Sequence, residues 1–93
     1  MTSGIHLNID AIWKRISQNA GEIFHQKRGG EFTYSIVNGA LIPSRTNQQI
    51  PRSEFAEALK LVPLSDTKPV QHLRGPSYIY AVLMDTRIKG DDW

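Results

Sequence analysis

The most regular hydrophobic pattern of the chain lies near its N-terminal end. Apolar side chains recur there at the three- and four-residue intervals that mark one face of an α-helix, namely at Ile9, Ile12, Trp13, Ile16 and Ala20. Asn8 is suited to cap the first turn, and Gly21 is suited to the left-handed conformation that often follows the last turn. We therefore predict a helix that begins near Ile9 and ends before Gly21.

Three short segments after this helix favour antiparallel strands, because their aromatic and β-branched residues suit a pleated sheet. The segments are Glu22–Gln26, Glu31–Val37 and Ala40–Ile42. The dipeptide Asn38-Gly39 separates the second from the third. Asn-Gly between two apolar runs is a strong hairpin signal, because a type I′ turn needs positive φ at both positions. A two-residue turn places Val37 opposite Ala40 and Ile36 opposite Leu41.

The second half of the chain predicts helices joined by polar connections. Ser44–Gln49 is wholly polar and is predicted to be a loop, from which Ile50-Pro51 leads into the next helix. An apolar stripe of helical spacing follows in Arg52–Leu61, and Pro63 ends this helix. The ten residues of Ser65–Arg74 are predicted to form a polar, irregular connection.

Two segments fit both a helix and a strand. Tyr78–Met84 is apolar throughout; Pro76 favours a helix because proline suits the first turn, whereas the β-branched and aromatic residues also suit a buried strand. Ile23 and Phe24 continue the apolar face of the first helix, so Glu22–Gln26 also fits a helical extension. We predict a helix for Tyr78–Met84 and a strand for Glu22–Gln26.

Together these elements predict a single α+β domain over residues 1–93. A three-stranded antiparallel meander packs with three helices, in the order α-β-β-β-α-α. The ordered core is expected over about residues 7–88, with frayed termini. The predicted core residues are Ile9, Ile12, Trp13, Ile16, Phe32, Tyr34, Ile36, Leu41, Phe55, Leu59, Ile79, Val82 and Leu83.

Composition narrows the classes of function. The chain has no cysteine, which excludes disulfides, thiolate metal sites and a cysteine nucleophile. His6, His25 and His72 lack the close spacing of zinc ligands, and no G-x-S-x-G nucleophile elbow occurs, so we predict no catalytic residue, metal or cofactor. No apolar run approaches the ~20 residues of a membrane span, and the first residues lack the order of a signal peptide. We therefore expect a cytoplasmic protein without membrane contact.

The distribution of charge suggests nucleic-acid binding as one hypothesis. The formal net charge is only +2, but between Ile23 and Ser53 the sole acidic residue is Glu31. The polar loop in this region offers side chains that contact phosphates and base edges. The candidate residues are Lys27, Arg28, Arg45, Asn47, Arg52 and Arg74.

A protein partner is the other hypothesis, and we place it first. The segment Tyr78–Met84 is very apolar for so small a domain, and exposed apolar surface marks sites of protein contact. The candidate interface residues are Tyr78, Tyr80 and Met84, facing either another protein or a second copy of this chain. Both hypotheses describe a non-enzymatic binding or accessory module.

Three blocks of the sequence resemble a family of small uncharacterised bacterial proteins with no assigned function. The blocks are FTYSIVNGALIPSRTN, IPRSEFAEALKLVPL and GPSYIYAVLMDTRI, and they cover most of the chain after Gly21. The resemblance implies a bacterial accessory protein. It brings no catalytic residue, cofactor or fold.

Overall fold

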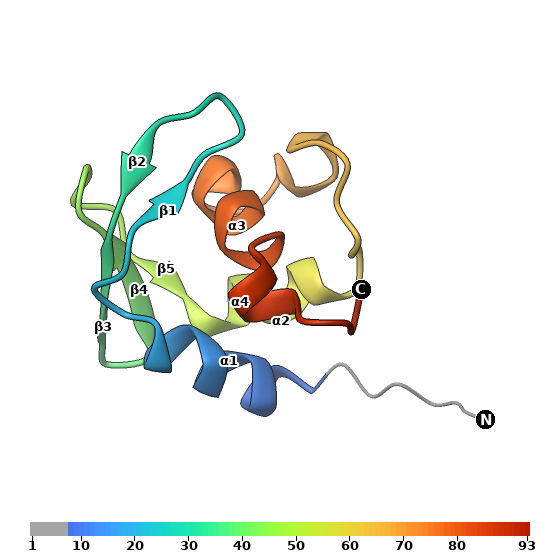
Figure 1. Cartoon of the computed structure of the whole chain (residues 1–93), viewed down its shortest axis with the longest axis horizontal. Helices are drawn as coiled ribbons and strands as arrows, with labels where there is room; N and C mark the ends of the chain where they lie inside the picture. Colours follow the sequence, from blue (N-terminus) through green and yellow to red (C-terminus); the bar gives the residue numbers. More distant parts are fainter. Residues whose placement is uncertain (1–7) are drawn as a thin grey trace.

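Two small antiparallel sheets and the helices packed with them form the structure, a computed structural model that describes residues 8–93 (Figure 1). The strands are β1 (Phe24–His25), β2 (Glu31–Phe32), β3 (Tyr34–Val37), β4 (Ala40–Pro43) and β5 (Ile50–Pro51). The helices are α1 (Ile9–Gln18), α2 (Arg52–Leu59), α3 (Pro76–Leu83) and α4 (Thr86–Lys89), with a 3₁₀ turn at Lys68–Val70. The α+β class predicted from the sequence is confirmed.

The strands form two separate sheets, so the predicted single meander is wrong in its pairing. β1 pairs with β2 alone, whereas β3, β4 and β5 form the three-stranded sheet. Ile50-Pro51, predicted only as a lead into a helix, forms β5 and pairs antiparallel with β4. The reason lies at Thr33, whose N–H donates to Ser44 Oγ at 3.0 Å and whose carbonyl accepts from Ser44 N–H at 2.8 Å. These bonds turn Thr33 away from β1 and toward the end of β4.

The β3–β4 hairpin forms as the sequence predicts. Val37 pairs with Ala40 and Ile36 with Leu41. Asn38 and Gly39 have φ angles of +50° and +75°, which is the combination that a type I′ turn requires. The local sequence therefore determines both the position and the register of this hairpin.

The remaining local predictions hold with small shifts. Asn8 Oδ1 accepts the Asp10 N–H at 2.7 Å at the start of α1, and Gly21 has a φ of +89°. Within Glu22–Gln26 the strand is confined to the two residues of β1. Tyr78–Met84 is helical, as α3, and α2 ends two residues before its predicted last residue, Leu61.

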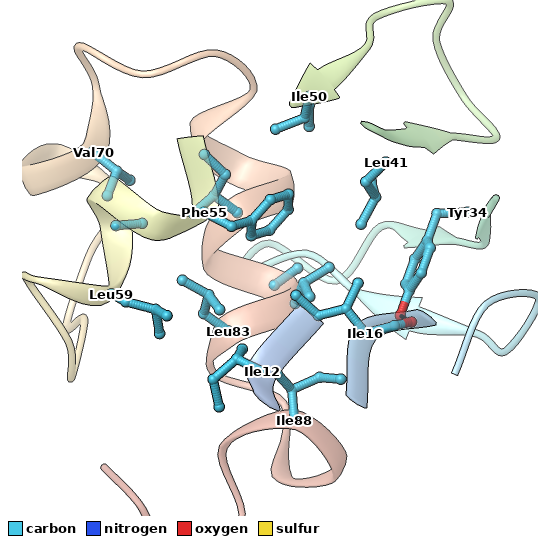
Figure 2. Close-up of a cluster of buried hydrophobic side chains, with 14 of the residues drawn as sticks. Ile12, Ile16, Tyr34, Leu41, Ile50, Phe55, Leu59, Val70, Leu83 and Ile88 are labelled. Atoms are coloured by element: carbon cyan, nitrogen blue, oxygen red, sulfur yellow. Dashed lines mark hydrogen bonds between the residues drawn. The ribbon is translucent and has the colours of Figure 1, made fainter. Parts of the chain in front are cut away.

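The hydrophobic core lies between the sheets and the helices (Figure 2). Of the predicted core residues, Ile9 and Ile36 are only partly buried, and the others are buried. The connection predicted to be polar and irregular gives Val70 and Leu73 to the core, and Leu64 lies just before it. The other buried side chains among residues 8–93 outside the predicted core are Phe24, Ala40, Pro43, Ile50, Ala58, Ala81 and Ile88.

The Tyr34 hydroxyl ties the hairpin to α1. It donates to the Ile16 carbonyl at 2.6 Å, and burial raises the pKa of Tyr34 well above its usual value. The hydroxyl therefore keeps its proton at neutral pH and remains a donor. This bond fixes the position of the three-stranded sheet on the helix.

The last residues of the chain contact α1 and α3. Arg15 Nη1 donates to the Ile88 carbonyl at 2.7 Å, and Arg15 Nη2 lies 2.7 Å from Asp92 Oδ2. The Trp93 indole N–H donates to the Leu83 carbonyl at 2.8 Å. The sequence did not predict these contacts. Fraying of the termini stays a prediction, and its N-terminal part lies outside the described residues.

Arg87 joins α4 to the segment that enters β1. Its guanidinium carbon lies 4.0 Å from the Phe24 ring centroid, and Nη2 donates to the Ile23 carbonyl at 2.7 Å. The Asp85 carboxylate accepts from Arg87 Nε at 2.9 Å and from the Arg87 backbone N–H at 2.8 Å. Burial raises the pKa of Asp85, but the hydrogen bonds and charge of Arg87 outweigh burial and hold this pKa below its usual range.

Asp85→Asn is expected to weaken the dependence of stability on acid pH. Because the pKa of Asp85 is lower in the folded protein, the unfolded chain binds more protons in acid. The carboxylate therefore stabilises the fold above its unfolded pKa of about 3.9, and this contribution is lost as the pH falls through the folded pKa. Asparagine retains the cap without the charge, so we expect a loss of about 1 kcal/mol of unfolding free energy at pH 7.

Urea unfolding at a series of pH values between about 2 and 7 measures this effect. Asp91→Asn, at an exposed position near the C-terminus, removes the same charge and serves as the matched control. The control is expected to follow the wild-type pH profile. A profile for Asp85→Asn that runs parallel to wild type would contradict the role given to Asp85.

Candidate functional site

Two loops bring basic side chains together at one end of the molecule. Lys27 and Arg28 lie in the turn between β1 and β2, at the top of Figure 1, and Arg45 lies in the β4–β5 loop. The loops touch, because Arg45 Nη1 is 3.4 Å from Gln26 Oε1. The absence of a side chain at Gly30 leaves room for the Arg45 guanidinium, because a Cβ there would lie 2.7 Å from Arg45 Nη1.

A small pocket opens beside these cations. It has a volume of about 150 Å³ and is lined by Gln26, Lys27, Arg28 and Ser77. Ser77 comes from the first turn of α3, and its Oγ accepts from Gln26 Nε2 at 3.1 Å. We call these four residues and Arg45 the loop-tip site.

Lys27 has contacts on the side that faces the 3₁₀ turn. Its Nζ donates to the Ser65 carbonyl at 3.1 Å and lies 3.4 Å from Asp66 Oδ1. It also lies 5.7 Å from the centroid of the Tyr80 ring, within reach of a cation–π interaction. The hydrogen bond from the Thr67 backbone N–H lowers the pKa of Asp66, and the hydrogen bond and charge of Lys27 lower it further. Asp66 is therefore ionised at neutral pH and offsets part of the positive charge of Lys27.

The other three basic-loop candidates lie elsewhere. Arg52 forms an ion pair with Asp10 of α1. Its backbone N–H donates to the Gly39 carbonyl at 2.9 Å. Gly39 lies at the opposite end of β4 from Arg45. The Arg74 backbone N–H donates to Glu54 Oε1 at 2.9 Å, and Arg74 Nη1 donates to the Gln49 carbonyl at 3.4 Å. Asn47 is exposed within the β4–β5 loop. The structure therefore gathers three of the six candidates.

The three candidates for a protein interface are half-buried on α3. The Tyr78 ring packs edge-on against Phe32, with 4.9 Å between centroids. Met84 Sδ accepts the Leu64 N–H at 3.3 Å, and Lys27 covers Tyr80. These side chains complete the core, and a partner would meet only their outer edges.

A separate apolar groove lies between α1 and α2. It has a volume of about 280 Å³ and is lined by Ile9, Ala56, Leu59 and Lys60. Lys60 at its rim pairs with Glu57 at 3.0 Å. Among residues 8–93, Lys60 is the one polar side chain that lines this groove, so the described lining offers few groups that could fix the orientation of a small ligand.

Buried charges, clustered metal ligands and membrane-spanning helices are other features that would indicate a function. Among residues 8–93 no charged side chain is buried, and no three His, Asp or Glu residues are placed to hold a metal ion. His25 lies 3.2 Å from Glu31 across the β1–β2 pair, and His6 lies outside the described residues. No helix of this part is long and apolar enough to cross a membrane.

Sequence reasoning missed two members of the loop-tip site, Gln26 and Ser77. They are 51 residues apart in the sequence, and neither belongs to a motif, so no local signal could have paired them. Comparisons with protein-family models, with curated proteins and with solved structures gave no match to this chain. The resemblance to a family of small bacterial proteins therefore stays a prediction.

Proposed function

We propose that this protein is a non-enzymatic nucleic-acid-binding module that contacts phosphates through the loop-tip site. The observation that carries the proposal is that Lys27 and Arg28 line a pocket completed by Ser77, and that Arg45, from a second loop, bonds to Gln26 of the same pocket. A cytoplasmic location, where nucleic acid is accessible, belongs to the same proposal.

The chemistry of the site suits phosphate better than a nucleobase. Phosphate oxygens accept hydrogen bonds, and Lys27, Arg28 and Ser77 each carry a donor. Arginine binds phosphate with two parallel N–H donors, and lysine adds a compact charge. Since the cations stand on exposed loops, a strand can reach them without any change in the core.

The double variant Arg28→Ala/Arg45→Ala is expected to weaken nucleic-acid binding about tenfold or more at low salt. It removes two phosphate contacts, so the slope of log K against log salt concentration is expected to fall by about 2. Fluorescence anisotropy with a labelled single strand and a labelled duplex, from about 50 to about 200 mM salt, measures both quantities.

Arg52→Ala is the matched control, because it removes an arginine whose side chain pairs with Asp10 at the other end of β4. It is expected to change the affinity less than twofold, as a distant rim charge does through long-range attraction alone. Failure of both probes to bind wild type at low salt would refute the proposed function. Equal losses in the control and the double variant would refute the assignment to the loop-tip site.

A protein partner stays a prediction beside this proposal. What supports it is the apolar groove of Ile9, Ala56 and Leu59, together with the exposed Leu61 that follows α2. The outer edges of Tyr78, Tyr80 and Met84 offer less apolar surface than their sequence pattern suggested, because these side chains pack on the core.

A further inference from the structure

A chain of side-chain hydrogen bonds orients the Ser77 hydroxyl in the loop-tip pocket. Arg45 Nη1 donates to Gln26 Oε1 at 3.4 Å, and Gln26 Nε2 donates to Ser77 Oγ at 3.1 Å. Arginine can only donate, so it turns the amide oxygen of Gln26 toward itself and the amide nitrogen toward Ser77. The Ser77 oxygen thus accepts, and within residues 8–93 its own proton makes no hydrogen bond. That proton is available to a ligand.

Three of the residues that line the pocket, Lys27, Arg28 and Ser77, carry hydrogen-bond donors. The side-chain oxygen of Gln26 accepts from Arg45. The pocket volume is about 150 Å³, well above the space that a single water molecule requires. It lies below the roughly 300–1,000 Å³ of sites that enclose drug-sized molecules. A single oxyanion fits this space, and a whole nucleotide does not.

The local charge selects the kind of oxyanion. Lys27 and Arg28 line the pocket with two positive charges, and the charge of Arg45, which bonds to Gln26, balances that of the Asp66 carboxylate beside Lys27. The neighbouring Glu31 contacts His25 rather than these cations. A phosphodiester carries one negative charge, whereas a terminal phosphate monoester carries about −1.5 to −2 at pH 7. The monoester matches the charge of the pocket.

We infer that this pocket binds the terminal phosphate monoester of a nucleic-acid strand. The inference rests on the function proposed above and adds a preference for strand ends to it. Lys27 and Arg28 supply charge, Ser77 donates to a phosphate oxygen, and Gln26 is a positioning residue that orients Ser77. Asp66 sets the net charge by holding part of the charge of Lys27.

The test compares three single-stranded oligonucleotides of one sequence, with a 5′-hydroxyl, a 5′-phosphate or a 3′-phosphate end. At constant ionic strength and pH 7.5, a phosphorylated end is expected to tighten binding about tenfold, which corresponds to about 1.4 kcal/mol. Near pH 5 the monoester loses part of its second charge, since its second pKa is about 6, and the advantage is expected to shrink to about threefold. Changes in protein charge far from the pocket affect all three probes alike and cancel in the ratio.

Two variants and one competitor locate the effect. Ser77→Ala is expected to reduce the phosphate advantage to less than about threefold, and Ser77→Thr, which keeps the hydroxyl, is expected to restore it. At constant ionic strength, inorganic phosphate is expected to lower the affinity for the phosphorylated strands more than the affinity for the hydroxyl strand. Circular dichroism confirms that each variant is folded.

The outcomes separate the inference from the proposed function. Equal affinities for the three strands would overturn the inference while leaving nucleic-acid binding intact. Absence of binding to any strand would overturn both. A phosphate advantage that persists undiminished in Ser77→Ala would also overturn the inference, because the phosphate would then lie outside this pocket.

Discussion

Replacing Phe55 by alanine is expected to lower the free energy of unfolding by about 3–5 kcal/mol, the range for loss of a buried phenylalanine side chain. Phe55 on α2 is 0% exposed, and its ring centroid lies 5.6 Å from that of Trp13 on α1. Figure 2 shows it between α3 and the three-stranded sheet, in the middle of the cluster. The substitution therefore removes contacts to several elements at once and leaves a cavity among them.

A loss of this size is a large part of the stability of the domain. A chain of this length is stabilised by about 5–14 kcal/mol in total, so Phe55→Ala brings a substantial unfolded population within reach of body temperature. Urea unfolding measures the loss directly. Val37→Ala also shortens an apolar side chain, but Val37 is 47% exposed, and its expected cost is below about 0.5 kcal/mol. A cost below about 1 kcal/mol for Phe55→Ala would contradict its central position.

Gly75→Ala is expected to cost about 2–4 kcal/mol, because two independent penalties add. Gly75 precedes α3 with a φ of +63°, a left-handed conformation that alanine adopts only at a cost of about 1–2 kcal/mol. A Cβ at this position would also lie 2.6 Å from Ile50 Cδ1. Ile50 is fully buried, so the clash cannot be relieved by moving a side chain into solvent.

Gly29→Ala separates the two penalties. Gly29 has a φ of +92°, but a Cβ there would meet nothing within 4 Å. Only the backbone penalty applies, and we expect a cost of about 1 kcal/mol. Thermal and urea unfolding of both variants give the comparison. Equal costs for Gly29→Ala and Gly75→Ala would show that the contact with Ile50 carries no energy.

The parts of the fold that the sequence predicts are those determined by neighbouring residues. The turn at Asn38-Gly39 forms because two adjacent residues accept positive φ, and α1 forms between its cap at Asn8 and Gly21. Both signals lie within a few residues of the structure that they determine. The helical stripe of α2 is local in the same way.

The parts that the sequence does not predict depend on contacts between distant segments. The meander is divided into two sheets because Thr33 bonds to Ser44, eleven residues away. Val70 and Leu73 are isolated apolar residues in a polar connection, and no helix or strand periodicity around them predicts their burial. Ile50 is buried because the loop before it is long enough to return the chain to β4.

The sequence likewise predicts only part of the candidate site. An excess of cations between Ile23 and Ser53 indicated Lys27, Arg28 and Arg45 as candidates, since charge can be counted along a chain. Their convergence depends on the contact between two loops. A count of charges along the sequence does not predict that contact. Arg52 met the same criterion, yet it lies at the opposite end of β4, beside Asp10.

The contact between α1 and the last helix bears on how the protein is made. Arg15 and Ile88 are 73 residues apart in the sequence, and Ile12, Ile16 and Ile88 lie together in the core (Figure 2). During translation α1 leaves the ribosome before α4 has been synthesised, so the part of its apolar stripe that packs on Ile88 has no partner at that time. This part of the stripe stays exposed to solvent or to chaperones until α4 emerges. The core around α1 is therefore completed only after α4 has been synthesised.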